Sequence, residues 1–145
     1  MNYMQDNYRI KIELEFQDFI KLIDATVSKE LNNSNQILSM DSRSLKKGDI
    51  FLALRGKKID GHDFIKEAYK NGASAAIVSR ENVSNPNKMP LILVDDTLSV
   101  LESLASYQRR NTKACFIAIT GSIGKTSAKV MLNSALSFFG NSSMS

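Results

Sequence analysis

The sequence predicts an α/β protein with a largely parallel sheet and a phosphate-binding loop. Short apolar stretches rich in β-branched residues alternate along the chain with stretches of helical periodicity, an order typical of parallel strands joined by helices. A glycine-rich loop, read T-G-S-I-G-K-T, lies between one such strand and one such helix. With 43% hydrophobic and 23% charged residues, the composition is that of an ordinary globular protein rather than a disordered one.

The N-terminal region is predicted to form one amphipathic helix. Residues up to about Lys11 are polar without a clear period, which is typical of an extended leader. The apolar residues that follow recur at helical spacing and predict a helix over residues 16–27 with one face in the core. This stripe consists of Phe16, Phe19, Ile20, Ile23 and Val27. A polar cluster at residues 32–35 is expected to end the helix.

The next stretch predicts a strand, a basic loop and a helix. Lys47–Asp49 reads as a turn before the short apolar strand Ile50–Leu54. A glycine-bracketed basic loop, Arg55–Gly61, follows this strand. Asp63 is then the expected N-cap of a helix that stops at Gly72, the expected C-cap.

Two more strands and a helix complete the predicted first domain. Ala73–Ser79 reads as a strand of small residues, and Leu91–Val94 as a second buried strand. Asp96 or Thr97 caps the helix that follows, because the apolar residues after them keep helical spacing. The polar segment Arg109–Lys113 is interpreted as the join to the glycine loop unit.

The glycine loop is expected to follow a buried strand. Cys115–Ile119 is continuously apolar, which is typical of a strand buried on both faces, and Cys115 is therefore predicted to be a core residue. Helical spacing resumes after the loop and predicts a helix over Ser127–Phe139, with Gly140 as its C-cap.

The residue types in the loop are suited to binding the phosphates of a nucleoside triphosphate. Gly121 and Gly124 allow the backbone to approach an anion closely, and the helix that follows directs its first N–H groups towards it. Lys125 can add a charge near the terminal phosphates, and the Thr126 hydroxyl can ligate Mg²⁺. Residues expected to surround the ATP phosphates are Gly121, Ser122, Ile123, Gly124, Lys125, Thr126 and Ser127. Ile119 stands where the general phosphate-loop pattern has its first glycine, so an ordinary glycine turn with a solvated lysine is the alternative.

Composition argues against several other classes of protein. The net charge of +4 comes from lysines and arginines scattered among acids, which does not indicate nucleic-acid binding. No apolar stretch is long enough to span a bilayer, and the N-terminus lacks the apolar core of a signal peptide. One cysteine and one histidine allow neither a disulfide framework nor a metal cluster of these residues. A cytoplasmic protein without a membrane partner is predicted.

Several segments together resemble the Mur ligase family of peptidoglycan synthesis. They are D-S-R at 41–43, residues 47–54, Gly56, D-G-H-D-F at 60–64, Gly72-Ala73, residues 119–122, G-K-T at 124–126 and Lys129. The resemblance covers nearly all of the chain from about Ile37. The D-S-R and D-G-H segments are shared by the E-type and F-type branches. The loop T-G-S-x-G-K-T-x-x-K is similar to the F-type branch, whereas E-type loops usually read T-G-T-N-G-K-T.

The resemblance implies an ATP-dependent amide ligase. ATP would phosphorylate the terminal carboxylate of UDP-N-acetylmuramoyl-tripeptide, and the amine of D-Ala-D-Ala would attack the resulting acyl phosphate. Mg²⁺ and a lysine would neutralise the charge on the transferring phosphoryl group, because that charge spreads over its oxygens. Lys125 and Thr126 are therefore the expected catalytic residues, with Thr126 as the Mg²⁺ ligand.

The resemblance also implies a uridine nucleotide on the first domain. Residues 1–112 would form the UDP-sugar-binding domain, and residues 113–145 the first strand, phosphate loop and helix of a truncated ATP-binding domain. Expected UDP contacts are Met40, Ser42, Lys57, Lys58 and Ile59. Asp41 and Arg43 are expected to pair with each other, and for His62, beside the start of a helix, a capping or packing role is favoured over catalysis.

Family members also need the rest of the ATP-binding domain and a further C-terminal domain. We therefore expect the chain to be the front of a longer, monomeric ligase and to be inactive alone. An E-type ligase that adds the third amino acid is one alternative. A non-catalytic UDP-sugar-binding remnant is another, and an unrelated nucleotide hydrolase with a phosphate loop is a third.

Overall fold

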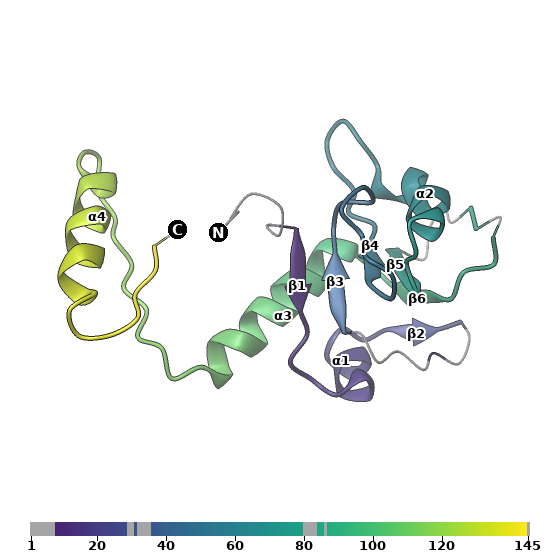
Figure 1. Ribbon diagram of the computed structural model, residues 1–145, viewed down its shortest axis with the longest axis horizontal. Helices are drawn as coiled ribbons and strands as arrows, with labels where there is room; N and C mark the ends of the chain where they lie inside the picture. Colours follow the sequence, from purple (N-terminus) through teal and green to yellow (C-terminus); the bar gives the residue numbers. More distant parts are fainter. Residues whose placement is uncertain (1–7, 29–30, 32–35, 80–83, 86, 145) are drawn as a thin grey trace. The chain divides into compact units, whose positions relative to one another are not determined.

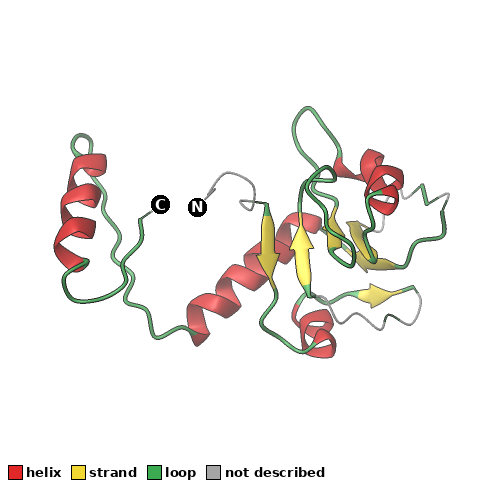
Figure 2. Ribbon diagram, viewed as in Figure 1, coloured by secondary structure: helices red, strands yellow, loops and turns green. Residues whose placement is uncertain are grey.

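The computed structural model describes residues 8–28, 31, 36–79, 84–85 and 87–144. The chain divides into two compact units, Met1–Asn111 and Thr112–Ser145. Figure 1 colours the elements of both units by their position in the sequence. Figure 2 shows that the strands drawn belong to the first unit. No helix among the described residues combines the length and apolar character needed to cross a membrane.

The described part of the first unit forms one mixed sheet of six strands. Their order across the sheet is β1-β3-β4-β5-β6-β2. The strands are β1 (Arg9–Lys11), β2 (Thr26–Val27), β3 (Ile37–Ser39), β4 (Ile50–Leu52), β5 (Ala75–Ser79) and β6 (Leu91–Val94). The four central strands, β3 to β6, pair in parallel, and the two edge strands pair antiparallel. The prediction of a largely parallel α/β sheet is confirmed.

Helices cover both faces of this sheet. They are α1 (Phe16–Leu22), the 3₁₀ helix η1 (Gly61–Phe64), α2 (Ile65–Lys70) and α3 (Thr97–Asn111). Alternate residues of the central strands point to opposite faces. Ile50 and Leu52 therefore pack in one apolar cluster with α1 and α3, and Phe51 packs in a second cluster with α2. The central strands are buried on both faces, as their continuous apolar runs indicate.

The N-terminal region differs from the prediction in two places. Residues 9–11, expected to be a leader, form strand β1, in which Ile10 pairs with Leu38 of β3. The predicted helix over residues 16–27 ends at Leu22. Asp24 has φ of +48°, which ends the helical turn, and Val27 pairs with Ile92 of β6. Pairing with a distant strand therefore overrides the local helical period of Val27.

Two of the three helix caps predicted in the first unit need correction. Asp96 caps α3, as predicted, by accepting hydrogen bonds from the amides of Leu98 (3.2 Å) and Ser99 (3.0 Å). Asp60 rather than Asp63 caps the start of η1, because the chain first turns in a 3₁₀ helix. Asn71 is the C-cap of α2, and Gly72 lies one residue beyond it with φ of +95°.

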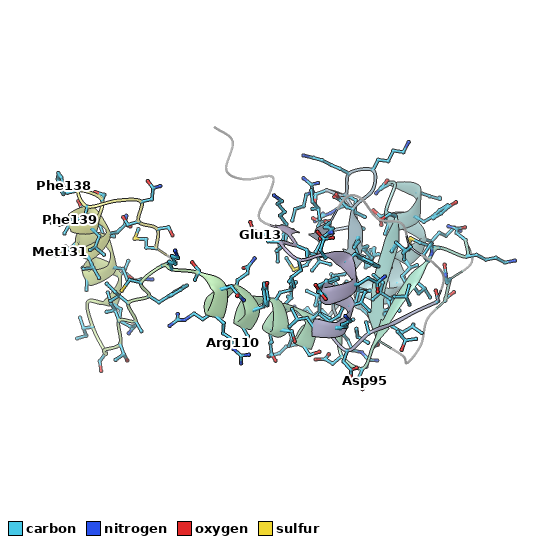
Figure 3. The ribbon with its side chains drawn as sticks, turned by 90° about the horizontal axis from the view of Figure 1, so that it is seen from below. Glu13, Asp95, Arg110, Met131, Phe138 and Phe139 are labelled. Carbon is cyan, nitrogen blue, oxygen red and sulfur yellow. The ribbon has the colours of Figure 1, made fainter. Side chains whose placement is uncertain are left out.

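The second unit holds helix α4 (Lys125–Leu136), and its predicted strand is absent from the described residues. Cys115–Ile119 is extended without a partner strand there, and Cys115 is exposed, contrary to the prediction of a core residue. The reason is that a strand is buried only when neighbouring strands and helices cover it. Helix α4 starts two residues before the predicted Ser127, and Ser137 rather than Gly140 is its C-cap. Figure 3 shows exposed Met131, Phe138 and Phe139 in this unit.

Candidate nucleotide-binding sites

The turn after β3 carries the D-S-R segment. The two carboxylate oxygens of Asp41 accept hydrogen bonds of 2.9 Å from Nε and Nη2 of Arg43. The hydrogen bond from the Arg43 side chain is the main reason that the pKa of Asp41 lies below its ordinary value. The two side chains pair with each other, as the sequence predicts.

Ser42 is held between β3 and α2. Only 7% of this residue is exposed, and its carbonyl oxygen accepts a hydrogen bond of 2.8 Å from the side-chain amide of Asn71. Asn71 lies at the C-terminal end of α2, 29 residues further along the chain. A contact across such a distance has no local pattern, so sequence reasoning missed Asn71.

A cavity of about 400 Å³ opens beside Ser42, and its size lies within the range of small-molecule sites. Aromatic and aliphatic side chains dominate its wall, with a few polar groups among them. The lining residues are Tyr8, Met40, Asp41, Ser42, Arg43, Phe51, Leu54, Ile59, Gly61, Phe64 and Glu67. Flat aromatic rings beside a few hydrogen-bonding groups suit a planar heterocycle such as a nucleobase.

The structure brings three of the five expected UDP contacts to this cavity. Met40, Ser42 and Ile59 line it, whereas Lys57 and Lys58 are exposed on the neighbouring loop and outside the lining set. Sequence reasoning missed Tyr8, which precedes β1, and Glu67 on α2. Phe51 and Phe64 were also missed as lining residues, although both belong to the segments that carry the family resemblance.

His62 has the structural role that its position predicts. Its backbone N–H donates to Oδ1 of Asp60 (3.0 Å), and its ring Nδ1 lies 2.5 Å from the same oxygen. Its Nε2 accepts a hydrogen bond of 3.0 Å from the amide of Ser79 at the end of β5. The hydrogen bond from the His62 amide is the main reason that the pKa of Asp60 is lowered.

The glycine loop of the second unit leads directly into helix α4. Gly124, its N-cap, has φ of +82°, and a Cβ there would strain the backbone although it would meet no atom within 4 Å. Because glycine offers no capping side chain, the amides of the first helical turn remain available to an anion. The Lys125 ammonium donates to the carbonyl oxygen of Gly121 at the opposite end of the loop.

All the predicted phosphate contacts lie together on this loop. The loop residues 121–127 are all exposed. Backbone N–H groups, an ammonium and hydroxyls around one helix N-terminus form a chemically suitable anion site. No group of three or more His, Cys, Asp or Glu side chains in the described ranges could hold a metal ion.

The fold and these two sites define an α/β protein suited to binding nucleotides. A family model described as "Mur ligase family, catalytic domain" matches residues 35–109. The chain belongs to the Mur ligase family.

Relatives of this chain carry the names of two kinds of ligase. The UDP-N-acetylmuramoyl-tripeptide–D-alanyl-D-alanine ligase of Rickettsia prowazekii is 44% identical over 77% of the chain. A UDP-N-acetylmuramoyl-L-alanyl-D-glutamate–2,6-diaminopimelate ligase of Prochlorococcus marinus is 37% identical over 78%. The crystal structure of MurF from Acinetobacter baumannii superposes with a TM-score of 0.72 at 32% identity over 84% of the chain.

A second similar structure was solved with a bound nucleotide. MurF ligase from Thermotoga maritima, solved in complex with ADP, superposes with a TM-score of 0.59 at 37% identity over 70% of the chain. The chain spans about a quarter of its relatives: 25% of the Rickettsia and 24% of the Prochlorococcus sequence, and 27% and 23% of the two solved chains.

Proposed function

We propose that this chain forms the uridine-nucleotide end and phosphate loop of an ATP-dependent ligase of peptidoglycan precursor synthesis. The reaction is the addition of D-Ala-D-Ala to UDP-N-acetylmuramoyl-tripeptide through an acyl phosphate. The observation that carries this proposal is the cavity, in which Ser42 of the D-S-R segment and the neighbouring Met40 and Ile59 meet a wall of aromatic rings. The names of the relatives support the choice of the F-type reaction.

In this proposal, the first unit binds the uridine nucleotide. Residues 1–112 form the UDP-sugar-binding domain. The uracil ring lies among Tyr8, Phe51 and Phe64, and Ser42 hydrogen-bonds the nucleotide. Lys57 and Lys58, on the exposed loop, contact the diphosphate outside the lined volume.

Binding of UDP-N-acetylmuramoyl-tripeptide to the purified chain tests this role. We expect saturable binding by calorimetry, and about tenfold weaker binding to the Ser42→Ala variant because one hydrogen bond is lost. Ser44→Ala is the matched control, since Ser44 lies in the same turn outside the lined cavity and its hydroxyl donates to the carbonyl oxygen of Asp41 (3.3 Å). Absence of binding to the wild-type chain would contradict the assignment of the cavity as the uridine-nucleotide site. An equal loss of affinity in Ser42→Ala and Ser44→Ala would contradict the role of Ser42.

Residues 113–145, within the second unit, supply the phosphate site of the ATP-binding domain. The ATP phosphates lie against Gly121, Ser122, Ile123, Gly124, Lys125, Thr126 and Ser127, and the Thr126 hydroxyl ligates Mg²⁺. ATP supplies the phosphoryl group that activates the substrate carboxylate. The chain's contribution is to orient this group with backbone N–H donors and to neutralise its charge with Lys125.

Replacing Lys125 by alanine is expected to weaken binding of Mg²⁺-ATP to the chain by about ten- to a hundredfold. The lysine provides a charge-assisted hydrogen bond, while alanine preserves the helix. Binding is measured from the shifts of the Gly121 and Gly124 amides in NMR titrations. Lys113→Ala, which removes an exposed lysine of the same unit outside the loop, is the control. Unchanged affinity in Lys125→Ala would contradict the phosphate site.

The chain alone is proposed to be unable to complete ligation. A phosphate loop and one helix supply neither the remaining sheet of an ATP-binding domain nor a site for D-Ala-D-Ala. We expect no amide product when the purified chain is mixed with ATP, Mg²⁺ and both substrates, and product detected by mass spectrometry would overturn this part. The parent ligase is proposed to be monomeric and cytoplasmic.

An E-type ligase is the second candidate. The Prochlorococcus marinus relative, named as a diaminopimelate-adding ligase, is 37% identical to the chain, and both branches share the D-S-R and D-G-H segments. The substrates differ by one residue, because an E-type enzyme takes UDP-N-acetylmuramoyl-dipeptide. Ligation assays of the parent enzyme with the dipeptide and the tripeptide substrates separate the two candidates.

A further inference from the structure

The loop between β4 and η1, residues 55–60, forms one wall of the cavity. An antiparallel bridge between Arg55 and Asp60 closes its base, and the amide of Gly56 donates to the carbonyl oxygen of Ile59 (2.9 Å). Ile59 lines the cavity although 64% of the residue is exposed. The position of this wall therefore depends on how the base of the loop is fixed to the sheet.

His62 connects the base of this loop to the sheet. Its ring Nδ1 lies 2.5 Å from Oδ1 of Asp60, the last residue of the loop. Its Nε2 lies 3.0 Å from the amide nitrogen of Ser79, the last residue of β5. Only 9% of the residue is exposed. The imidazole thus bridges the loop and a central strand from a buried position.

These contacts determine which ring nitrogen carries the proton. The backbone N–H of Ser79 can only donate, so Nε2 must be the unprotonated acceptor. A neutral imidazole then carries its proton on Nδ1 and donates it to Asp60. The bridge from loop to strand therefore requires one tautomer of the neutral ring.

Protonation of His62 would change this bridge. A proton on Nε2 would face the Ser79 amide, so the strand would lose its bond to the ring. The Ser79 hydroxyl, 3.2 Å from Nε2, could accept from the charged ring instead. On the loop side the ring faces Asp60, whose Oδ2 lies 3.4 Å from Nε of Arg55, while β5 presents the amide and hydroxyl of Ser79. Lys57 and Lys58, the other charged residues of the loop, are exposed. The lowered pKa of Asp60 favours the ionised carboxylate beside the ring.

We propose that His62 is a positioning residue for the nucleotide cavity: its neutral Nδ1–H form holds loop 55–60 against β5 through the Ser79 amide, and its protonation exchanges this amide for the Ser79 hydroxyl, which shifts the base of the loop and weakens nucleotide binding. This inference rests on the proposed function of the cavity. Loss of one hydrogen bond at the base of the wall is expected to weaken binding of a UDP-sugar about tenfold between about pH 8 and about pH 5.5.

Imidazole NMR tests the tautomer without any ligand. The chain has one histidine, so ¹⁵N spectra of the ring report on His62 alone. We expect a protonated Nδ1 and an unprotonated Nε2 at about pH 8, with the Gly56 amide shift following the ring titration as the pH falls. A protonated Nε2 at about pH 8, or a Gly56 amide that ignores the titration, would overturn the proposal.

Calorimetry with UDP-N-acetylglucosamine at the two pH values tests the effect on binding. The diphosphate of this probe is a diester that does not titrate in this range, so a change in affinity arises in the protein. His62→Asn retains a donor for Asp60 without a titrating ring, and is expected to bind at both pH values as weakly as the wild type does at the lower one. Ser79→Ala, which retains the backbone amide, should bind UDP-N-acetylglucosamine with wild-type affinity at the higher pH.

The outcomes separate this inference from the function on which it rests. Equal wild-type affinity at both pH values would overturn the positioning role and leave the cavity as a nucleotide site. Absence of binding at either pH would overturn the proposed function, while the NMR titration would still decide whether His62 holds the loop. Should His62→Asn fail to fold, the wild-type titrations decide alone.

Discussion

Replacing Asp49 by alanine is expected to lower the free energy of unfolding of the first unit by about 3–5 kcal/mol. The Asp49 side chain is 0% exposed and accepts hydrogen bonds of 2.9 Å from both Nε and Nη2 of Arg9, whose side chain is 10% exposed. It also accepts a bond of 2.9 Å from the amide of Lys46. Removing the carboxylate takes the balancing charge from a buried guanidinium and an acceptor from the turn before β4.

Urea unfolding followed by far-ultraviolet circular dichroism measures this loss. Asp18→Ala is the matched control, because the pair of Asp18 with Lys21 is exposed and 3.5 Å long, and should change stability by about 0.5 kcal/mol or less. The double variant Arg9→Met with Asp49→Leu should recover part of the loss, since apolar side chains replace both buried charges. An Asp49→Ala variant as stable as the control would contradict a stabilising buried pair.

Strands β4, β5 and β6 of the central sheet were predictable because each is marked by its own local sequence. Ile50–Leu52 and Leu91–Val94 are short apolar runs between polar turns, and a strand buried on both faces requires such a run. The cap at Asp96 was predictable for the same reason, since its carboxylate bonds amides only two and three residues away. Local chemistry therefore accounts for β4, β5, β6 and helix α3, whereas strand β3 (Ile37–Ser39) was not predicted.

The edges of the sheet were missed because distant residues create them. Arg9 is fixed by Asp49, 40 residues away, and Val27 by pairing with Ile92. Neither partner can be identified from the neighbouring sequence. In Cys115–Ile119 the local pattern indicates a buried strand, but the described residues provide no neighbouring strand to bury it.

The candidate sites likewise combine residues that a local motif identifies with residues that only the fold brings together. The glycine loop was identified because its residues are contiguous, and Met40, Ser42 and Ile59 because they lie in or beside family segments. Tyr8 and Glu67 reach the cavity only through the pairing of β1 and the packing of α2, which no local signal reports. Motifs therefore indicated the two candidate sites, while folding determined which further side chains line the cavity.

Replacing Gly61 by alanine is expected to destabilise the first unit by about 3 kcal/mol and to abolish UDP-sugar binding. A Cβ at this position would stand 2.7 Å from both the backbone nitrogen and the oxygen of Leu54, and 2.8 Å from the carbonyl carbon of Ala53. These are backbone atoms beside β4, so no side-chain rotation can relieve the overlap. Gly140→Ala is the control, since a Cβ there meets no atom within 4 Å.

Urea unfolding and calorimetry with a UDP-sugar measure the two effects of Gly61→Ala. The amide of Gly61 donates to the carbonyl oxygen of Leu54 (2.8 Å), which brings η1 against the end of β4. A methyl group at residue 61 would push η1 outward and draw His62 away from Ser79, so the cavity wall should move even where the chain still folds. Wild-type stability and binding in this variant would show that the close approach is not required. The loss expected here explains why a glycine separates Asp60 from His62: the residue between the loop and the imidazole must leave room for the backbone of β4.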